Sequence, residues 1–389
     1  MNNILRKKNK IAFIATTPFF FSSQLLNQLK NLKMNNFEIH IITSNVSPYS
    51  KTLIKYFNTH FVNIERKINI FNDILALFKI IFHLKRLNIS IVHSFTPKGG
   101  LLGMIAAFVC RIDLKIHTYT GQAWVTKNGM IKKIMIYCDK LINYLSDICL
   151  VDSESQKSFL IKNKIVKKKK IFCIGKGSIA GVDLNKFNRT KYIDKSKYIK
   201  NINGLSHRNL VITYVGRIHE EKGVFDLIRV FKNLSRKHPI FLIFLGPIDF
   251  QHKKSQIVFN KIIRTNHNIK YIKTKPNPEL IISITDILCL PSYREGFGSI
   301  IIQAAAMGVP CLGSNIIGIK DAIINNQTGL LFNHKNEYDF KKKLEKLIID
   351  KKLRAYLSKN SIAHVIKNYS SQNYEKKIIN LYKNIRKTK

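Results

Sequence analysis

A carboxylate and two glycines stand together in residues 292–308, SYREGFGSIIIQAAAMG. The apolar run before this segment is typical of a buried strand, and residues 299–307 are typical of a helix. Glu295, Gly296 and Gly298 therefore fall on a strand-to-helix turn. Glycines allow a ligand to approach the backbone, and the free NH groups of a helix's first turn attract phosphate. The carboxylate accepts hydrogen bonds from sugar hydroxyls, so we expect this turn to hold both ends of a nucleotide sugar.

A second strand, turn and helix is expected over residues 211–231. Gly216 ends the expected strand, and Arg217 and Lys222 flank the turn. Two fixed cations at such a turn can neutralise a diphosphate. Each turn by itself is equally typical of an ordinary loop with surface charges, but the two together are far more specific.

These residues resemble family 4 of the retaining glycosyltransferases, enzymes with the two-domain GT-B fold. The family's hallmarks are an E-x7-E motif followed by Gly-x-Pro, and an upstream G-R-x-x-x-x-K-G motif. The matching residues are Glu295, Gln303 and 308–310 for the first motif, and Gly216, Arg217, Lys222 and Gly223 for the second. Residues 92–103, 116–124 and 175–187 resemble a subgroup that builds bacterial surface polysaccharides. The resemblance covers nearly the whole chain.

One position departs from the family pattern, because Gln303 replaces the second glutamate. In the family this position binds the nucleotide ribose. An amide oxygen still accepts a hydrogen bond from a hydroxyl, although without the added strength of a charged acceptor.

The resemblance also implies roles for individual residues. Its candidates for the catalytic and electrostatic roles are Glu295, His117, Arg217 and Lys222, and for donor binding Phe297, Gly298, Ser299, Ile300, Gln303 and Gly216. The NH groups of Phe297 and Gly298 would face the sugar, and those of Ser299 and Ile300 the phosphate. The acceptor-side candidates are Lys98, Tyr119, Thr120, Gly121 and Gln122. Lys98 is equally compatible with a solvated surface lysine, and we expect His93, at the end of a similar strand, to be a buried structural residue.

The chain alternates short apolar strands with helical stretches in both halves. This pattern predicts an α/β protein with two parallel, Rossmann-like sheets. We expect an acceptor domain at 1–190, a nucleotide-sugar domain at 207–370, and a C-terminal helix at 371–389 that returns to the first domain. The polar segment 188–206 is the expected linker. Ligands of open parallel sheets bind beyond the carboxyl ends of the strands, so we expect the active-site cleft of this GT-B fold between the domains.

The chain of 389 residues has a net charge of +43. Such an excess suggests nucleic acid or an anionic membrane, although abundant Lys, Asn and Ile also indicate coding bias. We find no RNA-binding signature, helix-turn-helix pattern or Cys/His finger. The basic segments 127–140 and 167–170 favour attraction to an anionic leaflet. No apolar run reaches the roughly 18 residues that span a bilayer. We expect no signal peptide, because residues 5–10, LRKKNK, lead directly into the first expected strand.

The sequence thus predicts a retaining hexosyltransferase that moves a sugar, from a UDP-sugar or related donor, to a lipid-linked glycan in capsule, O-antigen or related synthesis. We expect it to need no metal, because cationic side chains neutralise the diphosphate. We also expect no cofactor, because the nucleotide sugar is a substrate. The expected location is cytoplasmic, peripheral at the inner face of the cytoplasmic membrane, with no specific nucleic-acid partner. A nucleotide-sugar epimerase of similar architecture and a non-enzymatic polyanion-binding protein are the alternatives.

Overall fold

The computed structural model describes residues 10–66, 68–192, 202, 204–273 and 277–387. The chain divides into two compact units: unit 1 is Met1–Ala180 with Gln372–Lys389, and unit 2 is Gly181–Ser371. The division falls before the expected linker, of which residues 193–201 and 203 lie outside the described part. The physical reason is that Val182 and Phe187 are already buried in the core of unit 2.

In the described part of unit 1, seven parallel strands form one sheet in the order β3-β2-β1-β4-β5-β6-β7. The strands are β1 (Lys10–Ile14), β2 (Glu38–Thr43), β3 (Asn58–Phe61), β4 (Ile91–Phe95), β5 (Leu114–Tyr119), β6 (Ile148–Val151) and β7 (Ile171–Cys173). The order reverses between β1 and β4, which is where open α/β sheets bind their ligands. Six of these strands were expected from the apolar runs 11–16, 37–44, 91–95, 115–118, 148–152 and 170–174, whereas the edge strand β3 was not expected.

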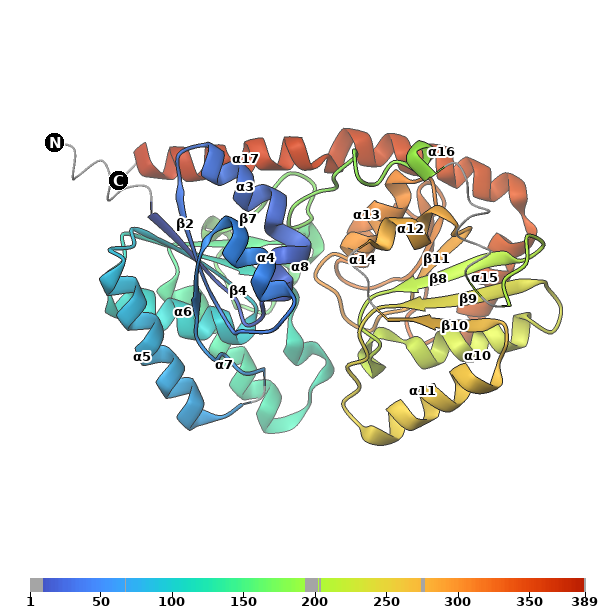
Figure 1. Ribbon diagram of the computed structural model, residues 1–389, viewed down its shortest axis with the longest axis horizontal. Coiled ribbons are helices and arrows are strands. Elements are labelled where there is room, and N and C mark those ends of the chain that lie inside the picture. Colours follow the sequence, from blue (N-terminus) through green and yellow to red (C-terminus); the bar gives the residue numbers. More distant parts are fainter. Residues whose placement is uncertain (1–9, 67, 193–201, 203, 274–276, 388–389) are drawn as a thin grey trace. The chain divides into compact units, whose positions relative to one another are not determined.

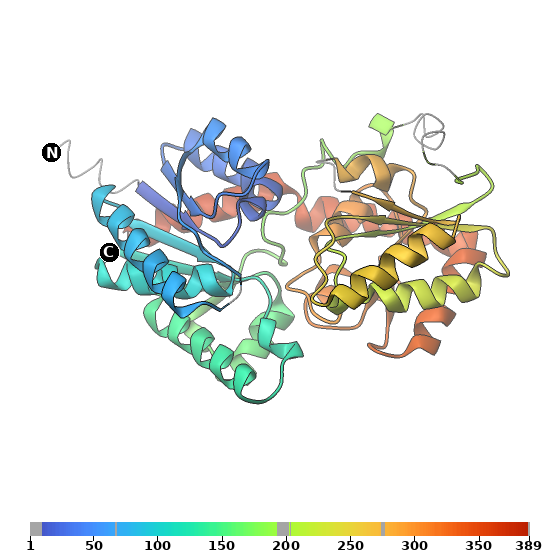
Figure 2. The ribbon, with the colours of Figure 1, turned by 60° about the horizontal axis from the view of Figure 1, so that its bottom comes forward.

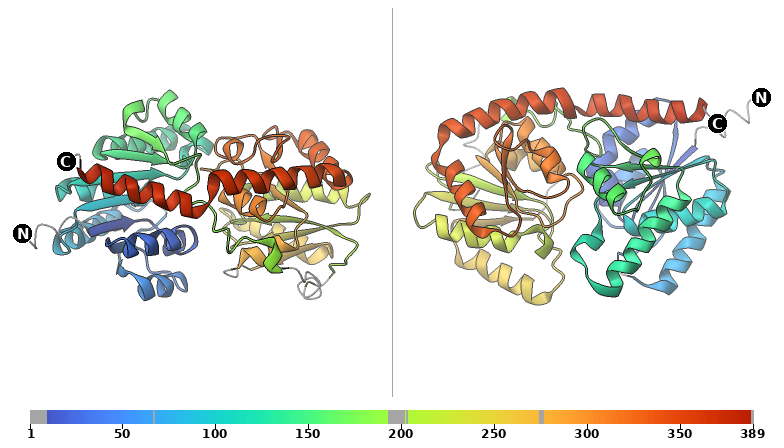
Figure 3. Two further views of the ribbon diagram at one scale, coloured as in Figure 1. Left: turned by 90° about the horizontal axis from the view of Figure 1, so that it is seen from above. Right: turned by 180° about the vertical axis from the view of Figure 1, so that it is seen from behind.

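Helices cover both faces of this sheet (Figure 1). The helices α5 (Ile70–Arg86), α6 (Pro97–Val109) and α7 (Gly129–Leu145) bury their apolar sides in a core on one face. On the other face lie α3 (Leu26–Met34) and α17 (Ser371–Lys387). Figure 3 shows α17 running along unit 1. Its Tyr382 is fully buried and hydrogen-bonded to Nδ1 of His93, so His93 is the buried structural residue that was expected.

In the described part of unit 2, six parallel strands form a second sheet in the order β10-β9-β8-β11-β12-β13. The strands are β8 (Leu210–Val215), β9 (Ile240–Leu245), β10 (Ile269–Ile272), β11 (Ile287–Leu290), β12 (Cys311–Ser314) and β13 (Gly329–Phe332). The helices are α10 (Val224–Leu234), α11 (Lys253–Thr265), α12 (Pro278–Ser283), α13 (Ser299–Ala306), α14 (Ile319–Ala322), α15 (Glu337–Ile349) and α16 (Lys351–Tyr369). The two predicted parallel sheets are confirmed.

The sheet of unit 2 reverses its order between β8 and β11. The carboxyl ends of these two strands are therefore neighbours, and the two turns singled out in the sequence follow them directly. Among the described residues, no helix combines the length and the apolar character needed to cross a membrane.

Candidate active site

Lys222 and Glu295 form an ion pair at the switch point of the unit 2 sheet. Lys222 ends a short 3-10 turn (Glu220–Lys222) after β8, and Glu295 lies in the loop after β11. Lys222 Nζ lies 2.6 Å from Glu295 Oε1 and 3.2 Å from the carbonyl oxygen of Arg294. Ser292 Oγ donates a second hydrogen bond to Oε1, at 2.9 Å. The structure thus joins the two motifs through their charged side chains.

The two loops meet because Gly223 has no side chain. Its φ is +66°, and a Cβ at this position would lie 2.1 Å from the carbonyl oxygen of Pro291. The backbone NH of Tyr293 donates to the carbonyl of Glu221 at 2.8 Å, which fixes the same contact. Any larger residue at position 223 would push Lys222 away from Glu295.

Burial and the ion pair act in opposite directions on the pKa of both members of this pair. Burial raises the pKa of Glu295, but the Lys222 ammonium and its hydrogen bond outweigh burial and hold that pKa below 4.5. Burial also lowers the pKa of Lys222, and Glu295 opposes this shift. The side chains are 14% and 18% exposed, so the charges are well shielded from water yet reachable by a ligand.

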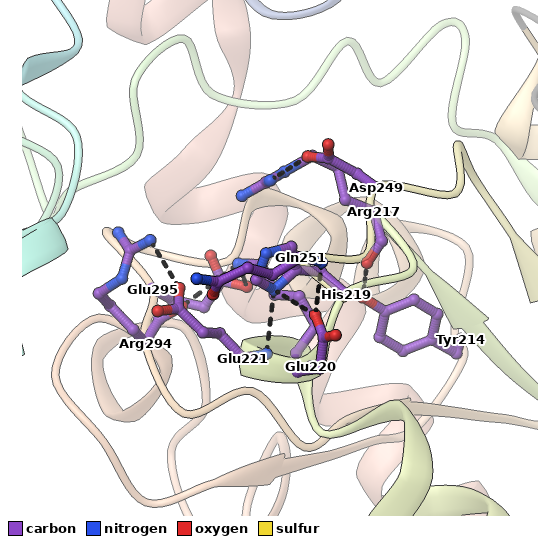
Figure 4. A network of polar contacts seen from close by, with 10 residues as sticks. Tyr214, Arg217, His219, Glu220, Glu221, Asp249, Gln251, Arg294 and Glu295 are labelled. Carbon is purple, nitrogen blue, oxygen red and sulfur yellow. Dashed lines mark hydrogen bonds and ion pairs between the residues drawn. The ribbon is translucent and has the colours of Figure 1, made fainter. Parts of the chain in front are cut away.

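Arg217 is paired as well, with Asp249 in the loop after β9. Its Nη1 lies 2.5 Å from Asp249 Oδ2, and the two side chains are 33% and 41% exposed. Tyr214 donates from its hydroxyl to the carbonyl oxygen of Arg217, at 2.7 Å, and Gly216 donates from its backbone to Leu245. Figure 4 shows this ion pair together with the charged turn around Glu220 and Glu221.

The helix α13 begins directly after this loop. Gly298 is its N-cap, with a φ of +83°, and no side chain caps the helix. Its first turn, which contains Ser299 and Ile300, therefore offers backbone NH groups, and NH groups at a helix start attract phosphate. Phe297 is buried against Tyr369, so only its backbone faces the loop. Gln303 is half-buried one turn later, and its side chain makes no hydrogen bond with the described residues.

Sequence reasoning missed several charged residues of this site. Arg294 Nη2 lies 3.0 Å from Glu221 Oε2, and Arg294 Nε is buried without a hydrogen-bond partner among the described residues. Asp249 was missed although it closely follows an expected strand, at the end where ligands bind. Arg294 directly precedes Glu295, so its position in the motif was the available signal.

In unit 1, His117 is buried at the end of β5. It is 2% exposed, and its Nδ1 lies 2.8 Å from Ser94 Oγ. Burial lowers the pKa of His117 to about 3, so the ring is neutral at physiological pH. A Cβ on Gly100 would lie 2.4 Å from its Cε1, which makes glycine necessary beside the ring. Nε2 makes no hydrogen bond with the described residues.

Two of the expected acceptor-side residues, Tyr119 and Gln122, have buried side chains. Tyr119 is 3% exposed and donates from its hydroxyl to the carbonyl of Asp139 at 2.8 Å. Gln122 is 4% exposed and accepts from Gln156 at 3.3 Å. These side chains turn into the core, because the chain after β5 packs around Trp124, whose indole donates to Asp139.

The remaining two candidates after β5 are backbone positions, since Thr120 is half-buried and Gly121 is buried with a φ of +96°. Lys98, at the start of α6, is paired with Asp73 of α5 at 2.8 Å. Its ammonium is therefore engaged within unit 1. Among the described residues, no group of His, Cys, Asp or Glu side chains is arranged to hold a metal ion.

Two family models match the chain. "Glycosyl transferases group 1" matches residues 195–364, and "Glycosyl transferase 4-like" matches residues 10–141. The first match contains the Lys222–Glu295 pair, and the second contains His117 and Lys98.

Several curated proteins resemble almost the entire chain. The capsular polysaccharide biosynthesis glycosyltransferase CapM of Staphylococcus aureus is 30% identical over 370 residues, which is 94% of each chain. A UDP-Gal:alpha-D-GlcNAc-diphosphoundecaprenol alpha-1,3-galactosyltransferase of Escherichia coli is 28% identical over 96% of this chain and 97% of its own.

Solved structures share the fold. Sucrose-phosphate synthase from Thermosynechococcus elongatus superimposes with a TM-score of 0.82 at 16% identity, over 98% of this chain and 100% of that chain. Anabaena Alr3699/HepE in complex with UDP and glucose has a TM-score of 0.79 at 14% identity, over 96% and 99%. The chain belongs to the group 1 glycosyl transferases, the family 4 enzymes of the GT-B fold.

Proposed function

We propose that this glycosyltransferase moves a hexose from a UDP-sugar, with retention, to a lipid-linked saccharide acceptor in bacterial capsule, O-antigen or related glycan synthesis. The observation that carries the proposal is the Lys222–Glu295 pair at the switch point of the unit 2 sheet, beside the uncapped start of α13. The names of the Staphylococcus aureus and Escherichia coli relatives, with their capsular product and diphosphoundecaprenol acceptor, support the substrate class.

The donor would be held by exchange of existing contacts. Lys222 and Arg217 would bind the diphosphate, and Glu295 and Asp249 would give up part of their present bonds. Glu295 would then accept hydrogen bonds from sugar hydroxyls, Gln303 would accept from the ribose, and the first turn of α13 would bind phosphate. Gly216 and the backbone of Phe297 and Gly298 would shape the loop around the sugar.

Transfer breaks the bond between the anomeric carbon and the diphosphate and forms one to the acceptor hydroxyl on the same face. The hydroxyl proton ends on the leaving diphosphate, whose growing charge the two cations stabilise. No cofactor is needed. The neutral His117 has one ring nitrogen to spare for a substrate hydroxyl, and the backbone of Thr120 and Gly121 would lie on the acceptor side.

The two alternatives predict different products. An epimerase would return a changed nucleotide sugar, and a polyanion-binding protein would turn over nothing. The relatives reported above are named as glycosyltransferases, which favours transfer.

A panel of radiolabelled UDP-sugars with an undecaprenyl-diphosphate-linked saccharide tests the proposal. We expect label to move to the lipid phase with one donor, and Glu295→Ala to abolish this transfer. Lys222→Ala should weaken UDP binding by about 1.5–3 kcal/mol, the scale of a charge-assisted hydrogen bond. Glu337→Ala, which removes an exposed carboxylate elsewhere in unit 2, is the matched control. Label that stays in the nucleotide-sugar pool, or normal transfer by Glu295→Ala, would refute the assignment.

A further inference from the structure

Helix α5 is apolar on both of its sides. One side is buried through Ala76, Ile80 and Leu84. The opposite side carries an exposed stripe at spacings of four and three residues: Phe71, Leu75, Phe78 and Phe82, which are between 45% and 71% exposed. A helix that is apolar all round is normally buried all round. No element in the described part of the chain therefore covers the outer stripe of α5.

Helix α7 repeats the arrangement. It is buried through Ile142 and Leu145. Its outer stripe has the same spacing and consists of Met130, Ile134, Tyr137, Leu141 and Tyr144, which are between 40% and 76% exposed. Single exposed apolar residues are ordinary on a protein surface, but two continuous stripes mark an interaction site.

The two stripes lie on the same layer of unit 1. Both helices pack against α6, and the inner sides of all three helices join one core over one face of the sheet. Figure 2 shows the three helices together along unit 1. We name the two outer stripes together, with α6 between their helices, the α5/α7 face.

Exposed cations border both stripes. They are Lys79, Lys85 and Arg86 on α5, and Lys133 and Lys140 on α7. Arg86 lies 5.9 Å from the Phe82 ring, and Lys140 lies 5.8 Å from the Tyr137 ring. The acidic side chains of these helices do not offset them, because Asp73 is paired with Lys98 and Asp139 is buried.

We propose that the α5/α7 face seats in the interface of an anionic lipid bilayer. Its aromatic and aliphatic stripes would enter the acyl boundary, while the flanking Lys and Arg side chains reach back to the headgroups. Charge complementarity favours an anionic bilayer as the partner. A second copy of the chain would place the same cations against those of the first copy, and a nucleic acid would leave the apolar stripes uncovered. The inference rests on the proposed function in one respect only: a lipid-linked acceptor gives the enzyme a reason to bind a membrane.

The apolar stripes of the α5/α7 face change how vesicle binding should depend on salt, compared with binding by charge alone. Attraction between cations and an anionic leaflet is screened by salt, whereas burial of the aromatic stripe is not. We therefore expect the protein to bind vesicles that contain phosphatidylglycerol, and high salt to weaken this binding without abolishing it. Pure phosphatidylcholine vesicles should bind more weakly, at the level that remains in high salt.

Vesicle co-sedimentation of the full chain separates the two contributions. The triple variant Phe71→Gln/Phe78→Gln/Phe82→Gln should bind about a hundredfold more weakly, from the loss of three partly inserted aromatic rings, and should bind nothing in high salt. Lys79→Gln/Lys133→Gln/Lys140→Gln should bind anionic and neutral vesicles alike. The matched control is Ile257→Gln/Tyr338→Gln/Ile349→Gln, which removes three exposed apolar residues of unit 2 and should bind as wild type.

Two readouts keep the inference separate from the proposed function. Both α5/α7 variants should retain wild-type UDP affinity and circular dichroism, because they lie outside the nucleotide site. Wild-type vesicle binding by the aromatic triple variant would overturn the inference, as would a wild-type dimer that the same variant dissociates. A wild type that binds vesicles but neither binds UDP nor transfers sugar would instead overturn the proposed function alone.

Discussion

The cations expected to act in this enzyme are already engaged in the structure. Lys222 is paired with Glu295, Arg217 with Asp249, and Lys98 with Asp73. Despite a net charge of +43, these three cations are therefore not free in the structure. A ligand that binds Lys222 or Arg217 must compete with an internal carboxylate, so donor affinity depends on the strength of each internal pair.

Asp249 offers the clearest test of this competition. The Asp249 side chain is 41% exposed in its ion pair with Arg217. Because water screens such a pair, we expect it to contribute about 0.2–1 kcal/mol of stabilisation. Asp249→Asn should release Arg217 and tighten UDP binding, measured by titration calorimetry, by about twofold to fivefold. Glu337→Gln, which removes one of the two carboxylates paired with Arg229 in the same unit, should leave UDP affinity unchanged. Weaker UDP binding by Asp249→Asn would show that Asp249 positions Arg217 for the donor.

Gln303 tests the one departure from the family motif. Its side chain is half-buried and makes no hydrogen bond with the described residues, so it is available to a ligand. If it accepts from the ribose, Gln303→Glu should preserve donor affinity or improve it by about 1 kcal/mol, because a charged acceptor bonds more strongly. Gln303→Leu should weaken donor binding. A folded Gln303→Glu variant with clearly poorer affinity would mean that the amide NH2 donates in the ribose pocket.

At the scale of elements, the site depends on two loops that meet at one glycine. Gly223→Ala adds a Cβ 2.1 Å from the carbonyl of Pro291 and strains a backbone with a φ of +66°. We expect a loss of about 3 kcal/mol in the free energy of unfolding, from strain and overpacking together. UDP affinity should fall as well, because Lys222 moves with the turn.

Gly129 is the matched control for this variant. It has nearly the same φ, +61°, but nothing lies within 4 Å of the Cβ position. Gly129→Ala should therefore show only the conformational strain, about 1–2 kcal/mol in urea unfolding, and normal UDP affinity. Equal losses in the two alanine variants would argue against the close contact with Pro291.

The elements were predictable to different degrees for physical reasons. Central strands such as β8, β9 and β11 are buried on both faces, so they are continuous apolar runs in the sequence. The edge strand β3, with the sequence NTHF, pairs only with β2 and has no fully buried side chain, so it leaves no apolar signal. Edge strands of this kind are recognised from their neighbour rather than from their own residues.

The residues of the candidate site were also predictable to different degrees. Glu295, Arg217 and Lys222 follow apolar strands at motif spacing, so their positions were predictable. Their partners were not all predictable, because the pairing of Arg217 with Asp249 joins loops 32 residues apart in the sequence. The inward turn of Tyr119 likewise depends on a contact with Asp139, on the following helix.

At the scale of the whole molecule, the chain order and the packing order differ. The segment Gln372–Lys389 follows unit 2 in sequence but belongs to unit 1. Its Tyr382 is fully buried, contacts the ring of Phe13, and is hydrogen-bonded to His93. Helix α17 thus completes the core on one face of the unit 1 sheet, and the stability of unit 1 depends on residues that follow unit 2 in the sequence.

Tyr382→Ala tests this dependence. Removing the ring should cost about 3–5 kcal/mol, the usual effect of deleting a buried aromatic side chain. Because the cavity opens in unit 1, amide hydrogen exchange should accelerate in β1 and β4 and remain unchanged in β8 and β11. UDP binding to unit 2 should persist. Tyr382→Phe keeps the ring and removes only the bond to His93, so it should cost about 1 kcal/mol. Equal acceleration of exchange in both sheets would show that the two units unfold together.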